Sequence, residues 1–192
     1  MKSKIDSIYI QKEDDRICQG DILRDYEYLE GVSIKEDEIK IEKRLIPYLI
    51  VLTQDCDLEN DYDNHTNGNN DNDKFLFSIL VCPGYTAIDL KDGLHLEKLK
   101  LKMQHIDSKR WKIVQNNQNP RYHFLKGELI YQIPNIVIDF KHYYTIPRDD
   151  LYKNYKNHCI GSINELFRES LSQRFAYYLS RVGLPLIDKI ME

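Results

Sequence analysis

The hydrophobic and polar positions of this chain indicate a series of short strands with one clear helix near the end. The apolar run over 47–53 has the length and β-branched content of a buried strand. Residues 31–46 alternate between aliphatic and charged positions, which predicts a half-exposed hairpin with its turn near Glu36 and Asp37. A second apolar run over 74–82 is expected to pair with 47–53 as the other arm of a long hairpin.

Further short elements are expected on either side of these strands. Residues 89–106 have partly helical spacing and predict one helix that Gly93 weakens, and 107–120 predict a turn or a second short helix. The other candidate strands are short apolar or aromatic runs bounded by Gly, Pro, Asn or charged residues: 8–10, 17–23, 122–125, 129–133, 136–140, 143–146 and 158–161.

The clearest helix is expected after Ser162, where Ser162 and Glu165 have the spacing of a capping box. Gly183 and Pro185 predict its end. The fold class that follows is mainly β with helical additions (α+β): a small bent sheet or SH3-like barrel with an insertion helix and a C-terminal amphipathic helix. The helix has one apolar stripe, made of Ile163, Leu166, Phe167, Leu171, Phe175, Tyr178, Leu179 and Val182.

The segment 59–73 interrupts the apolar pattern, because it has no aliphatic residue and one aromatic residue. It predicts a mobile, acidic and Asn-rich loop within a single domain spanning 1–192. No apolar run approaches the ~20 residues that a membrane span needs. The N-terminus has no apolar signal segment, so we expect a cytoplasmic protein with no membrane partner.

Charge is divided unevenly along the chain. Residues 1–97 carry 11 Lys and Arg against 22 Asp and Glu, whereas residues 98–185 carry 15 against 7. Either the basic half meets an anionic partner, or the two halves neutralise each other across the fold. The four cysteines stand singly, with no CxxC pair, so free thiols are expected, and neither a disulfide, a metal nor a cofactor is predicted.

The strand over 47–53 ends in Asp55, Cys56 and Asp57, at a place where a scaffold can present polar groups to solvent. Flanking carboxylates raise the pKa of a thiol, which disfavours Cys56 as a nucleophile. Asp55 and Asp57 are instead candidate catalytic residues. The alternative is that they are structural, or that they hold a cation, although no EF-hand spacing is present.

A second candidate site is the sequence Arg121-Tyr122-His123, which combines a cation, an aromatic ring and a titratable base. An RNA site can use these for phosphate binding, stacking and proton transfer, so Arg121 and His123 are candidate catalytic residues and Tyr122 a binding residue. In a strand, His123 would face away from Tyr122, and we expect it on the exposed side. The alternative is an ordinary surface histidine.

Arg174 and Arg181 lie seven residues apart on one face of the final helix and are candidate substrate-binding residues. Together with Arg168 they form either a phosphate-binding stripe or salt bridges to the acidic half. We expect one of these arginines beside Asp55 and Asp57, because carboxylates at the end of a buried strand need a cation nearby.

Two motifs resemble a known family. Gly20-Asp21-Ile22 and the run Pro47 to Thr53 resemble the opening of MazF/PemK-like barrels, over about the first third of the chain. The resemblance implies an SH3-like barrel and, in the toxin members, RNA cleavage. The blocks 53–58 and 173–185 are also similar to a group of bacterial proteins with no established activity. This chain is longer and acidic, and it has Gln54 to Asp57 where the toxins have a polar Ser or Thr region.

Two functions follow as hypotheses. The first is a bacterial nucleic-acid-directed protein, a toxin-type ribonuclease that holds RNA with the basic second half of the chain. The second is a non-enzymatic module of a bacterial stress or phage-defence system, which binds a protein encoded nearby through the barrel face or its 14 tyrosines. The sequence leaves open whether the protein is an enzyme and which oligomer it forms.

Overall fold

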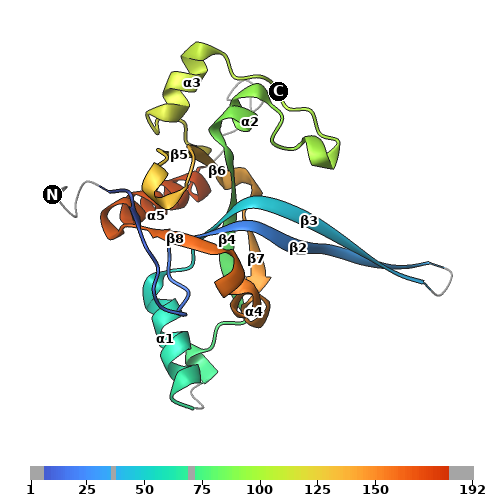
Figure 1. Cartoon of the computed structure of the whole chain (residues 1–192), viewed down its shortest axis with the longest axis vertical. Coiled ribbons are helices and arrows are strands. Elements are labelled where there is room, and N and C mark those ends of the chain that lie inside the picture. Colours follow the sequence, from blue (N-terminus) through green and yellow to red (C-terminus); the bar gives the residue numbers. More distant parts are fainter. Residues whose placement is uncertain (1–6, 36–37, 69–71, 182–192) are drawn as a thin grey trace, which may run out of the picture.

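The structure, a computed structural model, describes residues 7–35, 38–68 and 72–181. Figure 1 shows a curled antiparallel half-barrel sheet with helices on both sides, so the predicted α+β class is confirmed. The strand order is β1-β8-β2-β3-β4-β6-β5, and β7 pairs separately with β4. The strands are β1 Tyr9–Ile10, β2 Asp21–Lys35, β3 Glu38–Val51, β4 Ser78–Thr86, β5 Tyr122–Leu125, β6 Ile136–Asp139, β7 Tyr144–Pro147 and β8 Cys159–Ile163.

Helices account for 38% of the described residues and strands for 34%, so the chain is more helical than its sequence pattern predicts. The α-helices are α1 Asp55–Thr66, α2 Ala87–Asp92, α3 Ser108–Gln115, α4 Arg148–His158 and α5 Glu165–Leu179. The 3-10 helices are η1 Asn72–Lys74, η2 Glu97–Leu99, η3 Leu129–Tyr131 and η4 Phe140–His142. No helix in the described part of the chain is both long enough and apolar enough to cross a membrane.

The second half of β3 is the centre of the sheet, as its apolar run predicts. Leu49 belongs to a core that also contains Leu151 of α4, whereas Ile50 belongs to a core that also contains Leu171 and Phe175 of α5. Both faces of this strand are therefore buried, which is why its sequence is continuously apolar and does not alternate.

The sheet curls where β4 changes its partner. β4 pairs with β3 along one edge, which confirms the expected hairpin, and its other edge pairs first with β7 and then with β6. The strand continues past Pro83 to Thr86, further than the sequence pattern predicts. Gly84 allows this close packing, because a Cβ atom there would lie 2.8 Å from Ile50 Cδ1 and 2.9 Å from Ile136 Cγ2.

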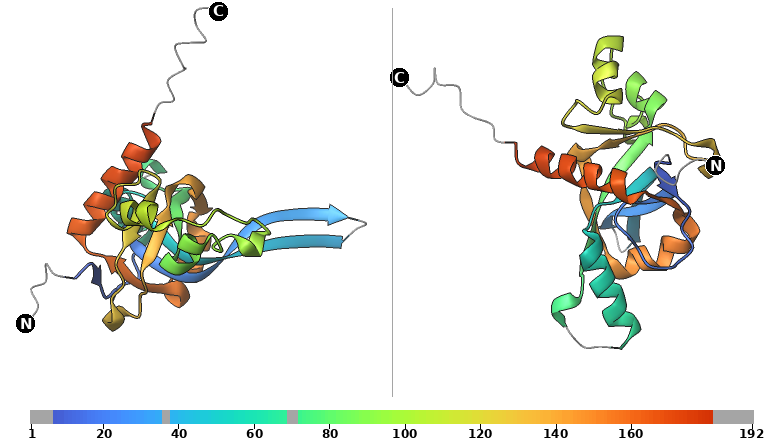
Figure 2. Two further views of the ribbon diagram at one scale, coloured as in Figure 1. Left: turned by 90° about the horizontal axis from the view of Figure 1, so that it is seen from above. Right: turned by 90° about the vertical axis from the view of Figure 1, so that its left-hand side faces the viewer.

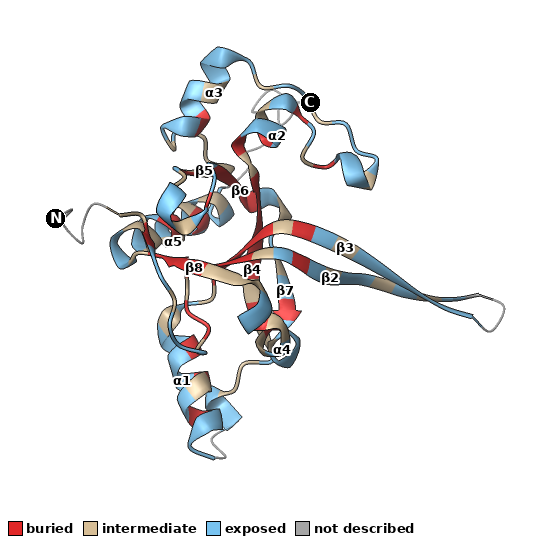
Figure 3. Ribbon diagram, in the orientation of Figure 1, coloured by how far each residue is buried: buried red, intermediate tan, exposed pale blue. Residues whose placement is uncertain are grey.

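The outer halves of β2 and β3 leave the body as a two-stranded arm (Figures 1 and 2). The predicted hairpin is confirmed by the register, which pairs Val32 with Ile41 and Ile34 with Ile39. Its turn at 36–37 lies outside the described residues. Figure 3 shows that the arm beyond its base is exposed on both strands.

The prediction of a loop over 59–73 is wrong as far as Thr66, because α1 covers the first half of this segment. Asp61 is fully buried and accepts hydrogen bonds from Leu76 N at 2.9 Å and from Arg148 Nε at 2.7 Å. Buried polar side chains therefore anchor this helix together with Leu58, and the composition of 59–73 alone did not reveal this.

Other local predictions also need correction. The helix expected over 89–106 ends at Asp92, since Gly93 has φ +78° and a Cβ there would lie 2.3 Å from Met103 O. The strand expected over 129–133 is the 3-10 helix η3, and α4 was not predicted at all.

The C-terminal helix is confirmed, but its start differs from the expected capping box. Ser162 lies in β8, and Asn164 precedes the first helical residue, Glu165. Leu171 and Phe175 of the apolar stripe are buried in the core. The remaining predicted positions at the end of this helix, 182–185, lie outside the described residues.

Candidate nucleic-acid interface

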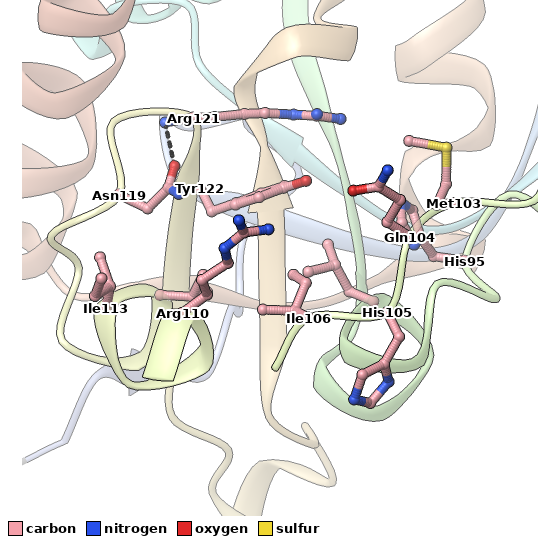
Figure 4. A pocket seen from close by; sticks show the side chains of 12 residues that line it. His95, Met103, Gln104, His105, Ile106, Arg110, Ile113, Asn119, Arg121 and Tyr122 are labelled. Carbon is pink, nitrogen blue, oxygen red and sulfur yellow. Dashed lines mark hydrogen bonds between the residues drawn. The ribbon is translucent and has the colours of Figure 1, made fainter. Parts of the chain in front are cut away.

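A pocket of about 450 Å³ lies between α2, α3, the segment 103–106 and the start of β5 (Figure 4). Its polar lining consists of basic and neutral side chains, and no Asp or Glu is among the described residues that line it. In Figure 4, Arg110 and Gln104 point toward the space beside the Tyr122 ring. The polar and basic lining residues are His95, Gln104, His105, Arg110, Asn119, Arg121 and Tyr122.

Arg121 is held in place by Asp139, the last residue of β6. Its Nε donates to Asp139 Oδ1 at 2.7 Å and its Nη2 to Oδ2 at 2.6 Å, which is the bidentate geometry of a strong ion pair. Asp139 is fully buried, whereas Arg121 is partly exposed. The guanidinium carbon also lies 4.8 Å from the centre of the Tyr122 ring. The pair therefore presents a fixed cation and an aromatic ring on one wall of the pocket.

Two histidines lie near this pair. His142 Nε2 is 3.7 Å from Asp139 Oδ2, and the His95 ring centre is 4.9 Å from that of Tyr85. Burial lowers the pKa of both His95 and His142, with Asp139 opposing the shift. Both imidazoles are therefore neutral near pH 7 and add hydrogen-bonding capacity to this region without adding charge.

The segment 98–112 beside the pocket is strongly basic, with six Lys and Arg against one Asp. All six are exposed, and Arg110 pairs with Asp107 at 3.4 Å. The other five make no ion pair within the described part of the chain: Lys98, Lys100, Lys102, Lys109 and Lys112. We call residues 87–115, which carry these cations together with α2 and α3, the α2–α3 lobe.

His123 does not share the pocket with Arg121 and Tyr122, and the expectation that it is exposed is wrong. Its side chain is 4% exposed, and Arg174 Nε donates to its Nδ1 at 3.1 Å. Burial and the Arg174 charge lower the pKa of His123 to about 3. A buried imidazole with this pKa is a hydrogen-bond acceptor inside the fold, poorly suited to proton transfer at neutral pH.

Arg174 likewise has structural partners. In addition to His123, its guanidinium donates to the carbonyl oxygens of Asn117, Asn119 and Tyr122, the last two at 2.7 and 2.8 Å. The side chain thus ties α5 to the turn that precedes β5. Arg181 is exposed, and its guanidinium carbon lies 4.4 Å from the Tyr178 ring centre on the same helix.

Asp55 lies at the start of α1, in a separate cluster with Arg16 and Arg168. It accepts the Gln19 backbone N–H at 3.0 Å, and its Oδ2 is 3.4 Å from Arg16 Nη2 and 3.5 Å from Arg168 Nη1. Burial would raise the pKa of Asp55, but the Gln19 hydrogen bond and the two arginines outweigh it and lower the pKa.

The expected cluster is therefore correct in part. An arginine of the final helix does contact Asp55, but it is Arg168, not Arg174 or Arg181. Asp57 is exposed, and the structure gives it no ion pair with any described residue. The predicted catalytic residues Asp55, Asp57, Arg121 and His123 thus occupy four different environments.

Comparison of the chain with family models, curated proteins and solved structures finds no match. Within the described residues, no group of three or more His, Cys, Asp or Glu side chains is placed to hold a metal ion.

Sequence reasoning missed Asp139, which positions Arg121. The available signal was a lone charge in the apolar run 136–140, since a carboxylate in a buried strand needs a cation or donors nearby. It also missed Arg16, whose contact with Asp55 joins residues 39 positions apart. No local pattern in the sequence reports such a pair.

Proposed function

We propose that this protein binds single-stranded nucleic acid through the α2–α3 lobe and the adjoining pocket. The observation that carries the proposal is the row of exposed lysines, which make no ion pair with a described residue. They lie next to a pocket whose described lining contains Arg110, Arg121 and Tyr122 and no carboxylate. Exposed lysines favour binding to nucleic-acid phosphates because they release the counterions held by those phosphates. The lobe is basic, although the whole chain has a net charge of −4.

The pocket supports a single strand over a duplex. Proteins bind unpaired bases by stacking them on aromatic or guanidinium planes, and Tyr122 and Arg121 provide both planes at one wall. Asp139 fixes the Arg121 guanidinium before any ligand arrives, which reduces the entropy lost on binding. A volume of about 450 Å³ falls within the ~300–1,000 Å³ of small-molecule sites, enough for one nucleotide.

The proposal is for binding and does not extend to strand cleavage. His123 is buried and accepts a hydrogen bond from Arg174, and Asp55 is paired with Arg16 and Arg168. Neither side chain can therefore contact a phosphodiester bound in this pocket. Cleavage of the toxin type would need an acid and a base beside the bound phosphate.

Fluorescence anisotropy with labelled 12-nucleotide RNA and DNA strands tests the proposal. We expect Lys100→Gln with Lys102→Gln to raise Kd about tenfold at low salt. The slope of log Kd against log salt should also fall by about 0.7 for each phosphate contact removed. The matched control is Lys126→Gln with Lys153→Gln, two exposed lysines outside the lobe, and it should change Kd less than about twofold.

The Kd values for the RNA and the DNA strand show which nucleic acid the protein prefers, because a contact to the 2′-hydroxyl favours RNA alone. Arg110→Gln tests the pocket itself, since this exposed residue contributes little to folding. Equal affinity of the lobe and control variants, or no binding of either strand at low salt, would overturn the proposal.

A further inference from the structure

The β2–β3 arm carries six exposed aliphatic side chains, and the strand register places all six on one face. Val32 and Ile34 pair with Ile41 and Ile39, so these four side chains lie on the same side of the ribbon. A bulge at Glu30 shifts the register, and Leu29 then pairs with Lys43, which alternates with Ile41. The six residues, which we call the arm face, are Leu29, Val32, Ile34, Ile39, Ile41 and Leu45, and they are 40% to 72% exposed.

The opposite face of the arm is polar, with Ser33, Lys40, Glu42 and Arg44. A two-stranded ribbon with one apolar and one polar face is the pattern of a strand pair that packs on another layer. Within residues 7–35, 38–68 and 72–181 no helix or strand covers the arm face, because the arm extends beyond the body (Figures 1 and 2). Among the described elements the arm face is therefore an apolar sheet surface without a covering layer.

Charge indicates the kind of partner. The arm, residues 27–45, carries six Asp and Glu against four Lys and Arg, which disfavours both nucleic acid and an anionic lipid surface. The charged pair that crosses the arm face, Lys43 and Glu27, is neutralised internally by a contact of 2.8 Å. The arm face also lacks the aromatic residues typical of membrane-interface segments. A second apolar protein face is the occupant that this surface fits.

We propose that the occupant is a second copy of this chain, with two arms packed face to face and antiparallel about a twofold axis. The six side chains expose on the order of 600 Å², at the upper end for an apolar patch on a monomer. Two copies then bury roughly 1,200 Å², which reaches the lower limit of specific, stable interfaces. An apolar face with no net charge, on which Lys43 pairs with Glu27, is self-complementary, as an isologous interface requires.

The base of the arm supports the antiparallel orientation. A groove of about 500 Å³ lies there, lined on the arm by Asp25 and by residues 43–47. Lys43 and Leu45 of this lining alternate with Ile39 and Ile41 and so share the arm face. Leu94 and Leu99, of the segment after α2, line its other side. In an antiparallel pair the tip of each arm, with Ile34 and Ile39, reaches this groove on the other copy, so both apolar surfaces are covered at once.

Light scattering coupled to size-exclusion chromatography tests the proposal on the full chain. We expect a dimer at about 50 µM that dissociates on dilution. Ile34→Ser with Ile39→Ser should raise the dimer Kd at least tenfold. The control is Ser33→Asn with Lys40→Asn, at neighbouring positions on the polar face, which should leave Kd within about twofold. Circular dichroism verifies that both variants keep the fold.

Disulfide trapping tests the orientation. In a Cys56→Ser background, which removes the exposed native thiol, Ile34→Cys and Leu45→Cys proteins are mixed and oxidised. Antiparallel arms join tip to base and give the mixed disulfide, whereas parallel arms give two homodimeric disulfides. A wild-type protein that is monomeric at about 200 µM would overturn the proposal. So would a dimer that survives the arm-face variant, or homodimeric disulfides alone.

Discussion

Replacing Arg174 by alanine distinguishes a structural arginine from a ligand-binding one. The sequence pattern placed Arg174 and Arg181 together as substrate-binding residues, but the structure separates them. The Arg174 guanidinium donates to three backbone carbonyls and to His123 Nδ1, whereas Arg181 contacts its own helix at the surface. We expect Arg174→Ala to destabilise the fold and Arg181→Ala to leave it unchanged.

The magnitude follows from the acceptors that lose their donor. An unsatisfied buried acceptor costs ~1–3 kcal/mol, and His123, 4% exposed, is the most deeply buried of the four partners. Water can reach part of the site, because Arg174 is only half buried. We therefore expect Arg174→Ala to lower the free energy of unfolding by about 3 kcal/mol, a large share of the ~5–15 kcal/mol of a typical domain.

Urea unfolding followed by circular dichroism measures this change. With a slope of ~1–3 kcal/mol/M, a loss of about 3 kcal/mol moves the midpoint down by roughly 1–3 M. Arg181→Ala should stay within about 0.5 kcal/mol of wild type, as exposed substitutions do. Arg174→Lys should fall between them, since one ammonium group cannot satisfy four acceptors in the guanidinium geometry.

A different pair of results would refute this reasoning. If Arg174→Ala unfolds within about 1 kcal/mol of wild type, its hydrogen bonds do not hold α5 to the turn before β5. If the same variant also loses affinity for a single strand, Arg174 is a ligand-binding residue, as the sequence pattern suggested. The binding site would then include α5, and the affinity measurements would have to be repeated with variants of this helix.

Two further predictions concern the same helix and the strand beneath it. Phe175→Ala should cost ~3–5 kcal/mol, because this buried ring contacts Phe140, whereas Leu179→Ala, half exposed, should cost less than ~1 kcal/mol in the same urea assay. The pKa of about 3 for His123 lies below its unfolded value, so the folded state binds fewer protons and stability falls as pH drops below ~6.5. His123→Gln should remove up to ~1.4 kcal/mol per pH unit of this slope between about pH 6 and 4, and an unchanged slope would contradict the assignment.

The sequence by itself determined the elements whose patterns are strong and local. The apolar run of β3 and the stripe of α5 indicate burial on both faces of a strand and along one helical edge, and the structure confirms both. The alternation over 31–46 indicates a hairpin with one apolar face, and the register confirms the pairing and the shared face. These patterns survive because the hydrophobic effect acts on side chains in fixed periodicities of two and 3.6 residues. The α+β class follows from them.

Tertiary structure decided what polar residues do. Helix α1 could not be recognised from its composition, because Asp61 is held by Arg148, 87 positions away. In the same way His123 was expected at the surface, although its strand lies beneath Arg174 of α5. Hydrogen bonds and ion pairs offset the cost of desolvating these groups only when the fold brings a residue from a distant part of the sequence into contact with them.

The candidate site shows the same division. Arg121 and Tyr122 were identified from the sequence because a cation and an aromatic ring stand together, and both line the pocket. Their support by Asp139 and the separation of Asp55 from His123 depend on how strands far apart in the chain meet in one sheet. The alternation of aliphatic and charged residues over 31–46 identified the arm face in the sequence, but it predicts only that one face of the hairpin is buried. Which described element covers that side depends on where β2 and β3 leave the body, and within the described residues the side is exposed.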